Sequence, residues 1–202
     1  MKLLCFKIKD MKNILIINGH PDEESYNYAL SEAYKAGAKQ TNSNIATLNL
    51  INLSFNPILN FGYRKRTDLE PDLEHAIAEI KKADHIVWVF PMWWYGYPAL
   101  LKGFIDRTFL PGITFQPIEG KPFPKPLLKG KTSRLIITSD TPRWYDRFIM
   151  KSPTINQFKK GTLEFCGIKP VKTSYIAPIK GSSNAFRKEW LQKIERLGQT
   201  LS

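Results

Sequence analysis

His85-Ile-Val-Trp-Val-Phe-Pro-Met-Trp-Trp-Tyr-Gly-Tyr-Pro-Ala-Leu-Leu-Lys-Gly-Phe-Ile-Asp-Arg107 is the stretch that decides the fold. Its apolar start predicts a buried strand over residues 85–91, and a helix is expected to begin near Pro98, because proline suits a first helical turn. Loops are usually polar, so an aromatic loop at the end of a strand favours a wall for a flat ligand. Packing of the rings under a neighbouring element remains the alternative. The rings of this loop are Trp93, Trp94, Tyr95 and Tyr97.

Strands and helices are expected to alternate along the rest of the chain. Such alternation implies a parallel sheet with right-handed crossovers. Since neither a G-x-G-x-x-G nor a Walker pattern is present, five strands fit the flavodoxin-like order 2-1-3-4-5, an α/β three-layer sandwich. The expected strands cover residues 13–19, 45–50, 85–91, 135–139 and 171–176. The expected helices cover residues 26–38, 71–82, 98–109, 154–166 and 184–197.

Three loops are expected to meet at one edge of this sheet. In this strand order the ligand crevice lies at the carboxyl ends of strands one, three and four. The loops at those ends are residues 20–27, 91–97 and 139–145. The first precedes a helix N-terminus, which offers N–H groups and a positive dipole end to an anion. Ser25 and Asn27 could therefore bind a phosphate, although capping of the helix remains the alternative for both.

Length and cysteine usage bound the class of protein. The 202 residues fit one domain over residues 12–202, and residues 1–11 are expected to be an N-terminal extension. No apolar run is long enough for a membrane helix, and the first residues do not form a secretory signal. Cys5 and Cys166 suggest neither a disulfide framework nor a zinc site, so we expect a reducing cytoplasm and no bound metal.

The net charge of +12 raises the question of an anionic partner. The basic residues are scattered, and prolines interrupt their densest group, which therefore predicts a solvated loop. Attraction of phosphorylated substrates is the second interpretation. Nucleic acid comes third, because no recognition motif accompanies the charge. The group consists of Lys121, Lys125, Lys129, Lys131 and Arg134.

Three segments carry a family resemblance: Gly19-His-Pro21 with Ser25-Tyr-Asn27, the stretch 90–107, and Leu163-Glu-Phe-Cys-Gly-Ile168. They resemble the NAD(P)H:quinone oxidoreductase family, the DT-diaphorase-like group with the flavodoxin-like fold. The resemblance covers residues 12–197. It implies bound FMN or FAD, NAD(P)H as hydride donor, a homodimer, and ping-pong reduction of quinones or similar acceptors.

By motif position, the resemblance implies a set of site residues. Those expected at the flavin phosphates are His20, Ser25, Tyr26 and Asn27. Those expected against the isoalloxazine ring are Pro91, Met92, Trp93, Trp94 and Tyr95. The third flavin-contacting loop supplies Ser139, Asp140 and Thr141. The substrate side is expected to be formed by Trp94, Tyr145 and, from the partner subunit, Phe115. Apart from the resemblance, the loop 110–131 is Pro-rich, so it should project, with Ile113 and Phe115 exposed on a monomer; folding of these two residues back onto their own chain is the alternative.

One departure concerns the proton donor. Many family members carry Thr-Thr-Gly-Gly after strand four, followed by a tyrosine and a histidine, whereas this chain has Thr138-Ser-Asp-Thr-Pro142, and Phe148 stands near the expected histidine. Tyr145 is therefore the candidate catalytic proton donor, with a structural role as the alternative. Two further interpretations of function stay open: a regulatory flavoprotein ancillary to a potassium-efflux system, and a flavodoxin-type electron carrier. The basic charge argues against a carrier, since such carriers are usually acidic.

Overall fold

The computed structural model describes residues 11–201, so residues 1–10 of the expected extension lie outside the described part of the chain. A parallel sheet of five strands runs through the centre in the order β2-β1-β3-β6-β7. Counted along the chain, this is the predicted order 2-1-3-4-5, and the fold is flavodoxin-like. The strands are β1 (Lys12–Asn18), β2 (Ser43–Asn49), β3 (His85–Pro91), β6 (Thr132–Thr138) and β7 (Val171–Ile176).

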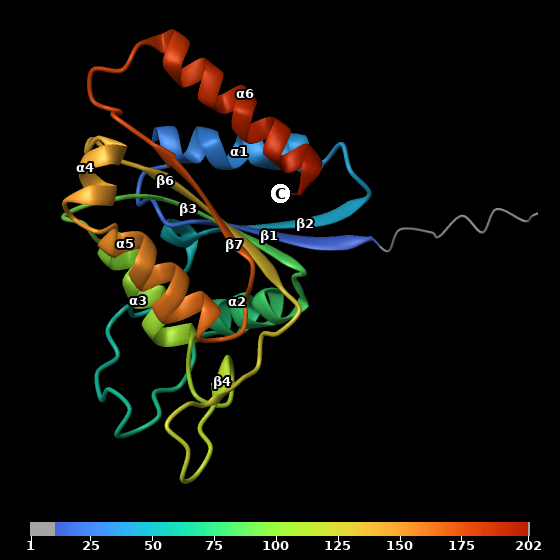
Figure 1. The fold of residues 1–202 in the computed structure, drawn as a ribbon. Helices are drawn as coiled ribbons and strands as arrows, with labels where there is room; N and C mark the ends of the chain where they lie inside the picture. Colours follow the sequence, from blue (N-terminus) through green and yellow to red (C-terminus); the bar gives the residue numbers. More distant parts are fainter. Residues whose placement is uncertain (1–10, 202) are drawn as a thin grey trace, which may run out of the picture.

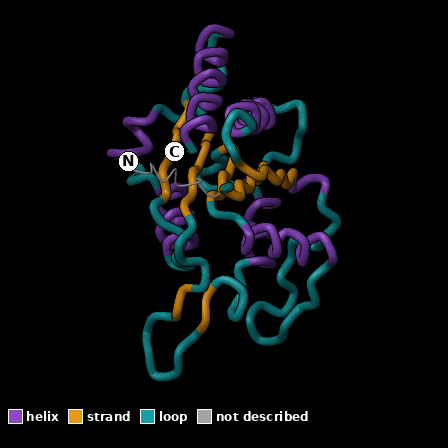
Figure 2. Tube along the Cα trace, turned by 90° about the vertical axis from the view of Figure 1, so that its right-hand side faces the viewer, coloured by secondary structure: helices purple, strands orange, loops and turns teal. Residues whose placement is uncertain are grey.

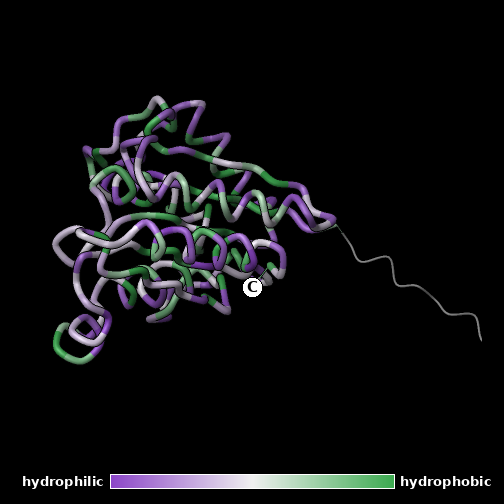
Figure 3. The backbone as a smooth tube through the Cα atoms, turned by 90° about the horizontal axis from the view of Figure 1, so that it is seen from above, coloured by the Kyte–Doolittle hydropathy of each residue, from purple (hydrophilic) through white to green (hydrophobic). Residues whose placement is uncertain are grey.

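Helices cover both faces of this sheet (Figure 1). On one face lie α1 (Tyr26–Ala38) and α6 (Asn184–Thr200). On the other lie α2 (Pro71–Lys82), α3 (Ala99–Thr108) and α5 (Pro153–Asn156), which continues into the π-helical segment η2 (Gln157–Glu164). Seen from above, apolar and polar residues alternate along the helices, as expected for elements with one buried face (Figure 3).

Glycines let α1 and α6 approach each other closely. A Cβ atom on Gly198 would lie 2.2 Å from the carbonyl oxygen of Tyr34, and one on Gly37 would lie 1.9 Å from that of Glu195. No side chain fits at either position. The two helices therefore pack closely at their C-terminal ends.

Strand β3 is buried along its whole length, as its continuous apolar sequence predicts. Trp88 and Phe90 point to one face, where their rings lie 5.0 Å and 5.4 Å from that of Phe158. Val87 and Val89 belong to the cluster on the other face, under α1 and α6. The central strand is therefore fixed from both sides, which gives the aromatic loop at its carboxyl end a rigid base.

The predicted bounds of α1, α2, β3 and β7 are confirmed. Strands β2 and β6 begin two and three residues before their predicted starts. Two further predictions need correction. The helix predicted over 154–166 is α5 followed by the π-helical η2. Residues 139–145 were expected to be loop, but a short helix, α4 (Arg143–Phe148), begins within them. Pro142 marks a turn in the sequence, yet it serves as the N-cap residue of α4.

The segment 110–131 projects from the body of the molecule, and two short strands cross it (Figure 2). These strands, β4 (Phe115–Gln116) and β5 (Lys125–Pro126), pair antiparallel and fold the start of the segment back on its own chain. The expected exposure of Ile113 was therefore wrong, because its side chain is 8% exposed. Phe115 is half-buried, 5.2 Å from the ring of Phe165. Arg134 does not belong to a solvated loop either: it is buried in β6 and donates to Ser174.

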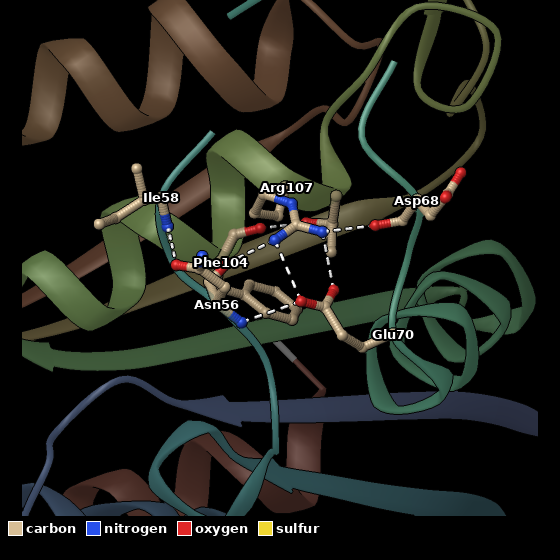
Figure 4. Close-up of polar contacts among 7 residues, drawn as sticks. Asn56, Ile58, Asp68, Glu70, Phe104 and Arg107 are labelled. Atoms are coloured by element: carbon tan, nitrogen blue, oxygen red, sulfur yellow. Dashed lines mark hydrogen bonds and ion pairs between the residues drawn. The ribbon is translucent and has the colours of Figure 1, made fainter. Parts of the chain in front are cut away.

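A buried arginine fixes the long connection between β2 and α2, which begins with a 3₁₀ turn, η1 (Leu50–Asn52). Arg107, 1% exposed, donates to the carbonyl oxygens of Asn56 and Asp68 and pairs with the carboxylate of Glu70 at 2.7 Å (Figure 4). Gly103 makes room for the connection, since a Cβ there would lie 2.3 Å from Pro57. In the described part of the chain, no helix is both long and apolar enough to cross a membrane.

Candidate flavin-binding site

A cavity of about 210 Å³ lies at the carboxyl ends of the strands, where the three predicted loops meet. Nine of the twelve residues predicted to bind the cofactor line it. Two further lining residues, Thr138 and Ile179, were not predicted: Thr138 is the last residue of β6, where the strand order places the crevice, and Ile179 lies in the loop after β7. The predicted lining residues are His20, Ser25, Tyr26, Asn27, Pro91, Met92, Trp93, Ser139 and Asp140.

The N-terminus of α1 forms one end of the cavity. Ser25 is its N-cap, and its Oγ accepts from the amide of Tyr28 at 3.2 Å, so the capping interpretation holds for Ser25. Asn27 does not cap the helix. Its Oδ1 accepts from Thr138 Oγ1 at 2.8 Å, while its Nδ2 is buried and has no partner among the described residues. A buried amide donor without a partner is costly, so this atom is the strongest sign of a missing acceptor.

The aromatic loop forms the second wall through a tight turn. The amide of Trp93 donates to the carbonyl of Gly96 at 2.9 Å, and the reverse bond measures 2.8 Å. The two central residues, Trp94 and Tyr95, have φ of 50° and 55°, a combination for which Asn-Gly is the favoured pair. Two bulky residues in the left-handed region cost roughly 1–2 kcal/mol each. Such strain is typical of functional sites, and here it leaves the ring of Trp94 fully exposed.

His20 joins the first loop to the aromatic loop. Its Nδ1 accepts from the amide of Asp22 at 3.0 Å, and its ring meets that of Trp93 edge-on at 5.6 Å. Burial lowers the pKa of His20, and the neighbouring Asp22 offsets only part of this effect. The imidazole is therefore neutral at pH 7, with its proton on Nε2 and its Nδ1 already occupied.

The third loop is tied to the chain on both sides. The carboxylate of Asp140 accepts from the amide of Lys180 at 2.6 Å, and Ser139 Oγ accepts from the amide of Thr141 at 2.9 Å. Asp140 thus lines the cavity while its charge holds the loop after β7. Backbone bonds engage the amides of Met92, Trp93 and Gly96, so the N–H groups of the aromatic loop that remain for a ligand within the described residues are those of Trp94, Tyr95 and Tyr97.

Five of the predicted residues lie outside the cavity lining. Trp94 and Tyr95 occupy the turn beside it, and Thr141 follows the lining residue Asp140. Tyr145 is on α4 with its ring against that of Trp144, at a centroid distance of 5.7 Å. Phe115 lines a separate cavity of about 430 Å³, together with Phe165 and Cys166. Phe115 therefore does not line the cavity of about 210 Å³ in its own chain.

Comparison with known proteins agrees with this architecture. The family model for the flavodoxin-like fold matches residues 12–200. The chain belongs to the flavodoxin-like NAD(P)H:quinone oxidoreductase family. Human ribosyldihydronicotinamide dehydrogenase [quinone] is 26% identical to this family member over 214 residues, with 92% of each chain covered.

Two solved structures share the fold of this reductase-family chain. The structure of Smu.1420 from Streptococcus mutans UA159 superposes with a TM-score of 0.82 at 31% identity, covering 93% of this chain and 99% of that chain. An FMN-dependent NADH-azoreductase from Bacillus anthracis, solved in complex with FMN, superposes with a TM-score of 0.75 at 21% identity, covering 95% and 99%. At that identity the likeness of the azoreductase concerns the fold alone.

The residues of the cavity fit a flavin. The orphaned Nδ2 of Asn27 and the helix N-terminus suit a phosphate, and Pro91, Met92 and Trp93 suit an apolar ring. The volume of about 210 Å³ is below the roughly 300–1,000 Å³ of sites that enclose a whole ligand. The cavity can therefore take only part of a flavin, and the exposed rings of Trp93 and Trp94 offer further surface next to it.

Proposed function

We propose that this protein is a flavin-dependent NAD(P)H oxidoreductase that reduces quinones or similar acceptors in a ping-pong reaction. The observation that supports this proposal most strongly is the buried, unpartnered Nδ2 of Asn27 in a cavity that also includes a helix N-terminus. The names of the relatives support the oxidoreductase class, and the flavin is FMN or FAD. The reducing cytoplasm remains a prediction from cysteine usage.

The chain's own residues would divide the work as follows. Asn27 Nδ2 and the first amides of α1 bind the phosphate, which satisfies the orphaned donor. The apolar wall of Pro91, Met92 and Trp93 excludes water from one side of the ring. The amides of Trp94 and Tyr95 donate to the polar edge of the ring and stabilise negative charge there. The bound flavin supplies the hydride chemistry between NAD(P)H and the acceptor.

Tyr145 remains the candidate proton donor, since it lies on α4, three residues beyond Pro142 and next to the third loop. Its side chain is 37% exposed, so the phenol can reach an acceptor outside the cavity. Tyr145→Phe should then lower turnover with quinones while flavin affinity stays the same. Equal turnover of the Tyr145→Phe variant and the wild type would leave the tyrosine a structural role only.

Flavin titration of the apoprotein tests the phosphate end. Ser25→Ala with Asn27→Ala removes two side-chain partners, and hydrogen bonds to charged groups contribute roughly 1.5–3 kcal/mol each, so affinity for FMN should fall at least tenfold. Asn27→Asp, which replaces the free donor by a carboxylate, should weaken binding further. Ser183→Ala is the control, because Ser183 caps α6 in the same way at 3.2 Å without lining the cavity. A wild-type protein that binds neither FMN nor FAD would refute the proposal.

A homodimer would complete the site. In one chain the cavity is small and open, and Phe115 lies in a different cavity beside Phe165, which is 40% exposed. We therefore expect a C₂ dimer in which Phe115 of each subunit covers the partner's flavin. Sedimentation should give about twice the chain mass of 23.3 kDa. Phe115→Ala should lower turnover more than flavin retention, whereas Phe123→Ala, exposed on the same segment, should not. A fully active monomer would argue against the dimer.

A further inference from the structure

Helix α4 buries a charged side chain and exposes its aromatic side chains. Its only buried side chain is that of Asp146, which is 0% exposed. Trp144 and Phe148, both 61% exposed, face outward. A surface helix normally buries its apolar residues and exposes its charges. The position of α4 must therefore come from polar contacts, and its apolar face stays available to a ligand.

The carboxylate of Asp146 is the centre of these contacts. It pairs with Arg143 and accepts from Ser152 Oγ at 2.8 Å, and the amide of Ser152 donates to the carbonyl of Asp146 at 2.8 Å. Lys151 and Ser152 both have positive φ, 60° and 50°, so the chain bends sharply back beneath α4. The side chain of Arg143 is 44% exposed, but that of Asp146 is buried, so loss of Arg143 would leave a buried carboxylate without its counter-ion.

Tyr175 connects the anchor to the cavity. Its hydroxyl donates to the carbonyl of Thr141 at 2.9 Å, and the guanidinium carbon of Arg143 lies 4.9 Å from the centre of its ring. Burial raises the pKa of Tyr175, so the phenol is protonated at pH 7 and can donate. The amide of Thr141 in turn donates to Ser139 Oγ, and Ser139 lines the cavity. The cavity wall and α4 are thus joined through Tyr175 and Arg143.

We propose that Arg143 and Tyr175 are positioning residues, which hold the apolar face of α4 beside the cavity as the wall against which a flat, uncharged acceptor lies. This inference rests on the proposed function. The wall is next to the cavity in the chain, because α4 begins three residues after the lining residue Asp140. Trp144 and Phe148 would contribute the apolar surface of this wall.

The test compares two arginines on the same helix. Arg143→Gln and Arg147→Gln each remove one positive charge from α4, but only Arg143 belongs to the anchor; Arg147 lies over the ring of Phe148. Arg143→Gln should raise the KM for menadione about tenfold, because the released helix would no longer present its apolar face; tenfold corresponds to about 1.4 kcal/mol of acceptor binding. Flavin affinity and kcat should change less than twofold, about the scatter expected for a site without direct contact. Arg143→Lys, which retains the charge, should give a KM for menadione between those of the wild type and Arg143→Gln.

Hydrogen exchange of the α4 amides in the apoprotein gives a second measurement that does not depend on the flavin. Exchange should be faster in Arg143→Gln and unchanged in Arg147→Gln. Tyr175→Phe keeps the ring under Arg143 and serves if Arg143→Gln fails to fold; it should also raise the KM. Unchanged exchange in Arg143→Gln would refute the anchor. Faster exchange in Arg143→Gln with an unchanged KM for menadione would refute the acceptor wall. So would a Phe148→Ala variant whose KM is unchanged and whose subunit association alone is weaker. A wild type that does not bind flavin refutes the proposed function instead.

Discussion

The ion pair between buried Arg107 and partly exposed Glu70 gives the sharpest test of what fixes the connection between β2 and α2. Glu70→Gln keeps the shape of the side chain and removes its charge. Arg107 would keep the carbonyls of Asn56 and Asp68, but its guanidinium, 1% exposed, would lose its counter-ion. Removing one partner of a buried ion pair costs roughly 3–5 kcal/mol. We expect about 3 kcal/mol, the lower end, because both carbonyls remain and because the side chain of Glu70 is 29% exposed.

Urea unfolding followed by circular dichroism measures this loss of unfolding free energy. In a thermal melt, at roughly 2–4 °C per kcal/mol for a chain of this size, Tm should fall by roughly 6–12 °C. Glu74→Gln is the control, since Glu74 is exposed in the first turn of α2, four residues after the N-cap residue Glu70, and both changes remove one negative charge near the helix N-terminus. The reasoning fails if the two variants agree within about 0.5 kcal/mol, the usual range of surface substitutions. Replacing both partners, as Arg107→Met with Glu70→Leu, should cost less than Glu70→Gln alone.

The same pair predicts a dependence on pH. Burial alone raises the pKa of Glu70, but hydrogen bonds from the amide of Asn56 and from Arg107 outweigh it and hold the pKa below the ordinary 4.5. A carboxyl with a lowered pKa contributes stability that is fully present above its unfolded pKa and is lost as pH falls through its folded pKa. The difference in unfolding free energy between wild type and Glu70→Gln should therefore be constant at neutral pH and shrink below pH 4.5. A difference that grows in acid would contradict the sign.

Two further substitutions test backbone and packing. Trp94→Gly should raise the unfolding free energy by about 0.5 kcal/mol, because relief of the left-handed conformation exceeds the added chain entropy, while flavin binding weakens. A loss of stability in this variant would mean that the exposed ring packs against the chain. Gly103→Ala should destabilise by roughly 1–3 kcal/mol, since its Cβ would clash with Pro57, whereas a Cβ on Gly161 meets nothing and Gly161→Ala should not destabilise. Equal Tm values for these two alanine variants would show that the close contact between Gly103 and Pro57 does not limit the side chain at position 103.

Sequence alone predicted the layers of the fold and most of the cavity. Continuous apolar runs identify strands that are buried on both faces, and helical periodicity identifies α1 and α2 to the residue. The strand order then follows from alternation, and the carboxyl-end rule brings the residues around His20, Pro91 and Ser139 together. These features depend on local patterns and on chain connectivity, both of which can be read along one dimension.

Only the tertiary structure decided which polar atoms have partners. Nothing in the sequence distinguishes Ser25, which caps α1, from Asn27, whose Nδ2 stays unpaired, because the difference lies in the contact between Asn27 and Thr138, 111 residues away. The inverted packing of α4 was missed for the same reason. An acid between aromatic residues predicts exposure, and Asp146 is buried because Arg143 and Ser152 surround it in space. Burial of a charge depends on its three-dimensional partners, which periodicity does not encode.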